Sequence, residues 1–161
     1  MYETRNDLNK NVREKIIGVL NVRLADAIDL YAQTKHAHWN VKGPNFIALH
    51  KLFDDIAGDV TAYVDDLAER VVQLGGVAEG MIKTIAQRST LPAFPPGGVW
   101  ETHVNAIAGA LAHFGKNVRA DIAHTDELGD ADTADLLTEV SRGVDKWVWF
   151  VEAHVQKESG R

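Results

Sequence analysis

The stretch KHAHWNVKGPNFIALHKLFDD, residues Lys35 to Asp55, carries three histidines, a tryptophan and two aspartates around a single Gly-Pro turn. The 161-residue chain contains no cysteine. Any metal site in it must therefore use imidazole and carboxylate ligands, which suit iron, manganese or zinc. The crowding of such side chains makes this turn the first candidate for a metal site.

Apolar residues recur at helical spacing on both sides of the turn. They predict a long first helix from Asp7 to about His38. A second helix, of about eight turns, follows. Asn45 is its predicted cap, and the glycines of Leu74-Gly75-Gly76 end it.

The rest of the chain predicts two more long helices after a long connection. Residues 77–98 contain a short helical piece, Met81 to about Arg88, and then LPAFPPGG, whose prolines rule out continuous helix. A third helix follows the spacing from Trp100 to Ile122, and a fourth that from Leu137 to Val151. Asp132-x-x-Asp135 is the predicted capping box of the fourth helix.

No strand pattern or repeat competes with these helices. The pattern predicts an all-α chain, a ferritin-like four-helix bundle with a short helix in the crossover between helices 2 and 3. We expect one domain over residues 1–161, with short polar tails at about 1–6 and 157–161.

The second helix is predicted to have a ligand face separate from its apolar face. On a helical wheel with His50 at zero, Asp54, Asp65 and Glu69 fall at about 40°, 60° and 100°. Four further charged residues of the helix project elsewhere and are interpreted as a solvated surface; they are Asp55, Asp59, Asp66 and Arg70.

The pairs His50/Asp54 and Asp65/Glu69 are centred about 22 Å apart along this helix, too far to bind one ion. A two-fold axis near the midpoint would lay a second copy antiparallel. It would place Asp65/Glu69 of each chain beside His50/Asp54 of the other. Gly58, close to the midpoint, would let the two helices approach closely. The spacing thus predicts two identical sites between subunits.

The first helix contributes one histidine to this prediction. His38 is in phase with Ile17, Leu24 and Tyr31 and is expected to point inward. Taken alone, it could equally be a hydrogen-bonded core histidine. His36 lies about 200° away on the wheel and is expected to have a surface or structural role.

The same residues resemble the Dps family, the ferritin-like mini-ferritins of starved bacterial cells, over nearly the whole chain. The resemblance implies a hollow twelve-subunit shell that oxidises iron(II), preferably with hydrogen peroxide, and stores iron(III) mineral, protecting the cell from oxidative damage. The matching motifs are His38-Trp39-Asn40, Gly43-x-x-Phe46, Leu49-His50, Asp54, Asp65, Ala68-Glu69-Arg70 and Leu74-Gly75-Gly76.

The resemblance also implies a ferroxidase site that holds two iron ions, for which zinc or another divalent metal can substitute. Trp39 resembles the family's tryptophan that is thought to trap oxidising equivalents, although it could equally be an aromatic packed in a subunit interface. The implied ligands are His38, His50 and Asp54 of one subunit and Asp65 and Glu69 of its two-fold mate.

A second acidic group, Asp130, Asp135 and Glu139, lies at the start of the predicted fourth helix. The resemblance places it along a three-fold pore, where carboxylates would attract iron(II). The alternative is that these are helix N-terminal acids stabilised by the helix dipole, and both can hold.

The first rival function is that of a nucleoid-binding structural protein, and the charge of the chain bears on it. Seventeen basic against 23 acidic residues give a net charge of −6. Arg5 and Lys10 of the N-terminal segment are offset by Glu3 and Asp7, so DNA binding is expected to be weak or absent at neutral pH. This argues against a nucleoid-binding structural protein.

The second rival is a di-iron oxygenase on the same fold, and the chain contains none of the Glu-x-x-His motifs that such sites use. No signal peptide or membrane-spanning apolar run is recognisable. The expected location is the cytoplasm, with nucleoid association left open.

Overall fold

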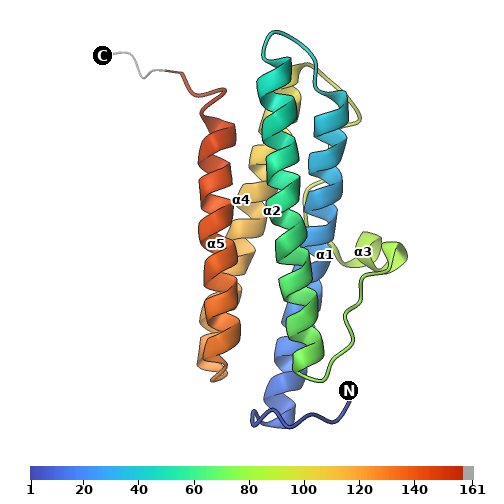
Figure 1. Cartoon of the computed structure of the whole chain (residues 1–161), viewed down its shortest axis with the longest axis vertical. Coiled ribbons are helices and arrows are strands. Elements are labelled where there is room, and N and C mark those ends of the chain that lie inside the picture. The colour runs from blue at the N-terminus through green and yellow to red at the C-terminus, as the bar shows by residue number, and fades with distance from the viewer. Residues whose placement is uncertain (158–161) are drawn as a thin grey trace.

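The structure is a computed structural model, and it describes residues 1–157. Figure 1 shows the long helices running side by side, with the short helix to one side of them. The predicted all-α bundle, with a short helix in the crossover, is confirmed. In chain order the helices are α1 (Lys10–Asn40), α2 (Phe46–Gln73), α3 (Ile82–Arg88), α4 (Trp100–Glu127) and α5 (Ala131–Glu152).

The bundle consists of two helical hairpins, α1 with α2 and α4 with α5, whose faces meet in one core. The crossover runs from the end of α2 to the start of α4 and carries α3, which contacts α1 (Figure 1). Each large apolar side chain buried here contributes roughly 1.5–3 kcal/mol. Completely buried examples from the four long helices are Leu20, Leu24, Phe53, Ile56, Leu111, Phe114, Leu137 and Val144.

The predicted glycine stop of the second helix is confirmed. Gly75 has φ 86°, and its N–H donates to the Val72 carbonyl at 2.9 Å, while the N–H of Gly76 donates to the Val71 carbonyl at 2.9 Å. This pair of bonds satisfies the last free carbonyls of the helix, as in a Schellman motif. The turn after α4 uses Gly129, also at φ 86°, in the same way.

The predicted start of the first helix needs correction, whereas the second begins directly after Asn45, as predicted, but without the expected side-chain cap. The first helix begins at Lys10 instead of Asp7, because the Asn9 side chain accepts the Asn11 N–H at 2.9 Å and caps it there. At the start of α2 the Asn45 side chain makes no capping bond. Instead, the N–H of Phe46 donates to the Gly43 carbonyl at 3.0 Å, so the turn itself satisfies that donor.

The predicted capping box of the last helix was also wrong. Asp130, directly after Gly129, is the N-cap of α5, and its carboxylate accepts the Thr133 N–H at 3.1 Å. Asp132 and Asp135 lie inside the helix. The tight glycine turn moves the cap two residues earlier than the spacing of acids suggested.

The N-terminal segment is held against the turn after α2. The N–H of Tyr2 donates to the Gly75 carbonyl at 2.7 Å, and Arg13 donates to the carbonyls of Leu8 and Leu74 at 3.1 and 2.9 Å. Part of the predicted tail at 1–6 is thus fixed to the bundle. Of the predicted tail at 157–161, residues 158–161 lie outside the described residues.

Within residues 1–157, none of the helices combines the length and the apolar character needed to cross a bilayer.

Candidate metal centre

The turn between α1 and α2 brings His38 and His50 face to face. Their rings stack with centroids 3.8 Å apart and planes 21° apart. The Nδ1 of His38 is 2.7 Å from the backbone carbonyl of His50, and the Nδ1 of His50 is 2.9 Å from that of His38. Because a carbonyl oxygen only accepts, both rings must carry hydrogen on Nδ1. Each neutral ring then keeps its lone pair on Nε2, the arrangement that backbone carbonyls impose on metal-binding histidines.

Asp54, one turn after His50, supplies a carboxylate beside this pair. Its Oδ1 lies 4.0 Å from the Nδ1 of His38 and 2.6 Å from the Nζ of Lys35. The hydrogen bond from Lys35 lowers the pKa of Asp54, so this carboxylate is ionised at neutral pH. Lys35 and Asp54 line a shallow hollow of about 270 Å³ together with Gly58 and Thr61.

The second predicted pair, Asp65 and Glu69, lies further along α2, and both residues are exposed. Glu69 borders a mostly apolar hollow with Ala68 and Val72. Taken over residues 1–157, no group of three or more His, Asp or Glu side chains of one chain could hold a metal ion. His38, His50 and Asp54 lie close together but do not form such a group by themselves, and Asp65 and Glu69 lie apart from them.

Two aromatic residues of α1, Trp39 and Tyr31, are exposed. Trp39 is 69% exposed, and the Nζ of Lys35 is 5.8 Å from its ring centroid. Tyr31, which the heptad phase placed inward with His38, is 40% exposed, whereas Leu24 is buried. The inward prediction is therefore wrong for Tyr31, which lines an open hollow with Gly58 and Thr61 of α2.

Asp130 differs from the other two predicted pore acids. It is 3% exposed, and its Oδ1 accepts a hydrogen bond from the Nη2 of Arg70 at 2.7 Å. Since its carboxylate also caps α5, Asp130 cannot line a pore in this subunit, and its assignment there is corrected. Asp135 and Glu139 are exposed on α5. Arg70, interpreted from sequence as part of a solvated surface, is 8% exposed and bonds Asp130 and Thr133 instead.

Two members of the predicted solvated surface, Asp59 and Asp66, line a groove between α2 and α5 with Tyr63 and Glu139. Asp59 accepts a hydrogen bond from the indole N–H of Trp147 at 2.9 Å. Burial raises the pKa of Tyr63 to about 12, and the charges of Asp59 and Glu139 add to this effect. The groove is therefore acidic, with a phenol that stays protonated at neutral pH.

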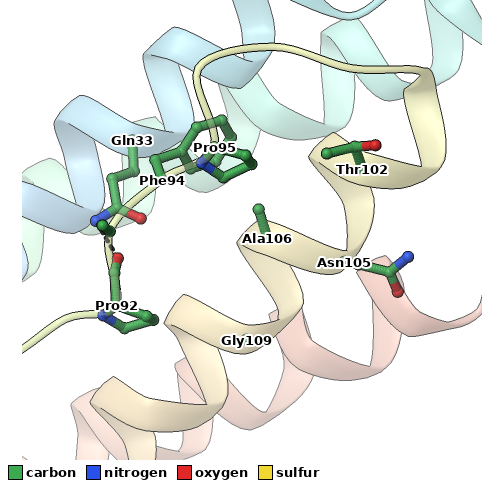
Figure 2. A pocket seen from close by; sticks show the side chains of 9 residues that line it. Gln33, Pro92, Phe94, Pro95, Thr102, Asn105, Ala106 and Gly109 are labelled. Atoms are coloured by element: carbon green, nitrogen blue, oxygen red, sulfur yellow. Dashed lines mark hydrogen bonds between the residues drawn. The ribbon is translucent and has the colours of Figure 1, made fainter.

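A larger cleft, of about 510 Å³, lies between α1, α4 and the proline-rich end of the crossover (Figure 2). Its walls are formed by Gln33, Pro92, Ala93, Phe94, Pro95, Thr102, Asn105, Ala106 and Gly109. None of these side chains is a carboxylate or an imidazole. The cleft therefore lacks the ligands that iron, manganese or zinc prefer.

His36 packs on Phe94 of this cleft wall, away from His38, with ring centroids 5.2 Å apart. Phe94 also stacks on His103 of α4 at 5.9 Å. His103 is 1% exposed, and its Nδ1 has no hydrogen-bond partner among the described residues. Burial lowers the pKa of His103, and His36 contributes to the same effect.

Sequence reasoning missed Lys35 and His103. Lys35 precedes His38 by three residues and Trp39 by four, so the i, i+3 and i, i+4 rule could have placed it on the same surface. His103 carried no such signal, because its neighbours in the fold lie outside its helix: Phe94 is in the crossover and His36 is in α1.

Comparisons with known proteins agree with this architecture. Residues 17–160 match the ferritin-like domain family. The chain is 42% identical to the DNA protection during starvation protein of Agrobacterium fabrum, with 98% of each chain covered. It is 30% identical to the fine tangled pili major subunit of Haemophilus ducreyi, over 96% of this chain and 88% of that protein. The solved structure of DpsC from Streptomyces coelicolor superposes with a TM-score of 0.93 at 32% identity, covering 99% of this chain and 94% of that one.

Proposed function

The chain belongs to the Dps family of ferritin-like proteins, and on that premise we propose that it is a ferroxidase and iron store. In this proposal it oxidises iron(II), preferably with hydrogen peroxide, at sites between two-fold related subunits. The iron(III) product is stored inside a hollow shell, expected to have twelve subunits, and the cell is protected from oxidative damage.

The observation that carries the proposal is the mutual hydrogen bonding of His38 and His50. Two backbone carbonyls hold both rings as Nδ1–H tautomers, with the Asp54 carboxylate 4.0 Å from one of them. A histidine that served only the core would not need this fixed tautomer and an ionised carboxylate close to its ring. Imidazole and carboxylate together suit iron(II), and carboxylates favour the harder iron(III) product.

Asp65 and Glu69 are proposed to complete the site from the two-fold mate. They share the helical face of His50 and Asp54 but lie about 22 Å along α2. Both are exposed, and so is Gly58 near the midpoint. Because Gly58 has no side chain, an antiparallel copy of α2 could approach closely at this point. Each two-fold axis would then create two identical sites.

The reaction is a two-electron step on two iron(II) ions. Each ion loses one electron, the peroxide O–O bond accepts both, and two protons complete two molecules of water. Carboxylate ligands stabilise the added charge of the oxidised metal, and ligand positions not filled by the protein admit the oxidant. Trp39, exposed beside the site, is proposed to trap oxidising equivalents that escape this step; packing in the subunit interface is its alternative role.

The same proposal includes expectations about iron entry, DNA binding and cellular location. Asp135 and Glu139 are proposed to attract iron(II) at a three-fold pore. DNA binding is expected to be weak or absent at neutral pH, because the chain is net negative and Tyr2 ties the N-terminal segment to Gly75. The expected location is the cytoplasm.

The proposal is tested by replacing Asp65 and Glu69 together with Ala. Fast iron oxidation should be lost while the shell still assembles, since exposed carboxylates contribute little to the buried core. The matched control replaces Asp55 and Asp66 of the same helix, which lie on another face. Wild-type oxidation rates in the Asp65/Glu69 variant would refute the site.

A mixing experiment tests whether two chains share each site. Subunits with only His38→Ala and subunits with only Glu69→Ala should each be inactive as pure shells. Shells reassembled from both should recover activity, because some sites then draw all their ligands from unmutated positions. If mass spectrometry proves mixing and no activity returns, the site lies within one chain.

A further inference from the structure

The turn between α1 and α2 is open to solvent along its length. Val41 and Leu49, at its two ends, are buried, but every residue from 42 to 48 is exposed. Gly43, in this exposed stretch, has φ 119°, a conformation that glycine adopts readily and other residues rarely. Its carbonyl accepts the N–H of Phe46, the first residue of α2. The backbone of Gly43 therefore sets where α2 begins relative to the end of α1.

Trp100, the first residue of α4, reaches this turn from the other hairpin of the bundle. Its Cδ1 lies 3.2 Å, and its Cγ 3.8 Å, from the place that a Cβ on Gly43 would occupy. Because glycine has no side chain, the indole can approach the backbone of the turn closely. Trp100 is half-buried and packs against the core. It thus connects the exposed turn to the interior of the bundle.

A second contact from the same region holds α1 just before the histidine pair. Phe94 of the crossover packs on His36 of α1, with ring centroids 5.2 Å apart, and on His103 of α4, at 5.9 Å. His103 lies one turn after Trp100 and is 1% exposed. The first turn of α4 therefore supports α1 through Phe94 and the α1–α2 turn through Trp100.

The bonds between His38 and His50 depend on the spacing of the two helix ends. Each bond joins the ring of one helix to a backbone carbonyl of the other, at 2.7 and 2.9 Å. Opening the turn by about 0.5 Å would lengthen both bonds to the limit of an N–H···O hydrogen bond or beyond it. A ring without its carbonyl partner can rotate and take the other tautomer. The closed turn is therefore a condition for the fixed histidine pair.

We propose that Trp100 is a positioning residue of the metal centre. By packing on Gly43 it holds the α1–α2 turn closed, so that His38 and His50 keep their reciprocal bonds and offer Nε2 to a metal ion. Trp100 acts through the backbone of the turn and not as a ligand. The inference rests on the proposed function and adds to it a residue from the opposite hairpin.

The test is titration of the assembled protein with cobalt(II) in the absence of an oxidant. Cobalt(II) has a visible spectrum that depends on its ligands and their geometry. Trp100→Ala should weaken binding about tenfold and change the spectrum of the bound ion, because the histidines lose their fixed orientation. Trp100→Phe keeps a ring against Gly43 and should restore most of the affinity and the wild-type spectrum. Val99→Ala, which shortens a 67% exposed side chain next to Trp100, is the matched control and should titrate as the wild type.

Thermal melting of the same proteins separates positioning from stability. A Trp100→Ala protein that melts earlier but binds cobalt(II) with wild-type affinity and spectrum would overturn the proposal. If that variant does not assemble, Trp100→Leu replaces it under the same criteria. The proposed function fails in a different way, if the wild type and His38→Ala bind cobalt(II) equally.

A crystal structure of the Trp100→Ala or Trp100→Leu protein gives a second measurement that needs no metal. At least one of the two bonds from Nδ1 of His38 and His50 to the opposite carbonyl should be broken. Two intact bonds there would contradict the positioning role of Trp100.

Discussion

Lys35–Asp54 and Arg70–Asp130 are ion pairs of almost the same length, 2.6 and 2.7 Å, in opposite surroundings. The Asp54 side chain is 56% exposed, whereas that of Asp130 is 2% exposed. Asp130 also caps α5, and Arg70 bonds Thr133 as well. The comparison teaches that a buried ion pair with several hydrogen bonds stabilises the subunit. A half-exposed carboxylate with one hydrogen-bond partner, such as Asp54, remains available to a ligand.

The histidines divide in the same way. His38 and His50 are fixed by two backbone carbonyls and lie beside a carboxylate. His36 and His103 both pack on Phe94, a wall residue of the cleft in Figure 2, and none of the wall residues of this cleft is acidic. Only the first pair has both a fixed tautomer and a neighbouring anion, the features of a metal site.

The largest effect is expected when the buried ion pair is broken. Asp130→Ala leaves the Arg70 guanidinium buried without its partner and α5 without its cap, which should cost about 3 kcal/mol of stability. Asp54→Ala, its counterpart in the exposed pair, should melt close to the wild type. Thermal unfolding at one subunit concentration measures both, and equal melting temperatures would remove the distinction between the pairs.

The two histidine pairs should differ next most strongly. His38→Ala should slow iron oxidation at least about tenfold, because it removes a proposed ligand and the ring that stacks on His50. His36→Ala, two residues earlier, should leave oxidation nearly unchanged, since His36 packs on Phe94. A comparable loss in both variants would mean that His36 also serves the site.

Among the three predicted pore acids, only the two exposed ones should affect iron entry. Asp135→Asn with Glu139→Gln should slow uptake at low salt about threefold and flatten its salt dependence, because steering by exposed charges is screened over about 8 Å at physiological ionic strength. Peroxide should still oxidise iron that is already inside. Initial uptake at several ionic strengths measures the effect, with melting temperature as the control. An unaltered uptake curve would remove the pore assignment.

The smallest effect concerns acid sensitivity. Burial lowers the pKa of His103 below its ordinary value of 6.5, so the unfolded chain takes up this proton more readily than the folded chain. The associated stability is complete above about pH 6.5 and is lost as the pH falls toward the folded pKa. Between about pH 7.5 and about pH 5.5, the melting temperature of His103→Gln should therefore fall by about 2 °C less than that of the wild type. His124→Gln, at an exposed position on the same helix, should follow the wild type, and parallel slopes in all three proteins would exclude this role of His103.

Local patterns predicted most of the fold because they depend on neighbours in the chain. The spacing of apolar residues predicted the long helices, and Leu74-Gly75-Gly76 predicted the end of α2, since a glycine with positive φ closes a helix by bonds within a few residues. The wheel likewise grouped His50, Asp54, Asp65 and Glu69, because the angle between side chains on a continuous helix is fixed by the backbone.

Contacts between distant segments escaped the same reasoning. Arg70 and Asp130 are sixty residues apart, and each alone reads as an exposed charge because charged residues usually are. Only the packing of α2 against α5 shows that they bury and satisfy each other. Tyr31 fits the heptad phase of Leu24, yet it is 40% exposed, in an open hollow that α2 also lines.

The sequence by itself determined a helical bundle with one long crossover, a carboxylate-bearing face on α2 and the likeness to the Dps family, because these depend on spacing along the chain. Tertiary structure alone decided which polar groups remain available. Backbone carbonyls across the α1–α2 turn orient His38 and His50, and Lys35 donates a hydrogen bond to Asp54. Arg70 bonds Asp130, which is buried. The physical reason is that hydrogen bonds and burial depend on distances through space, which residue types and their order do not specify.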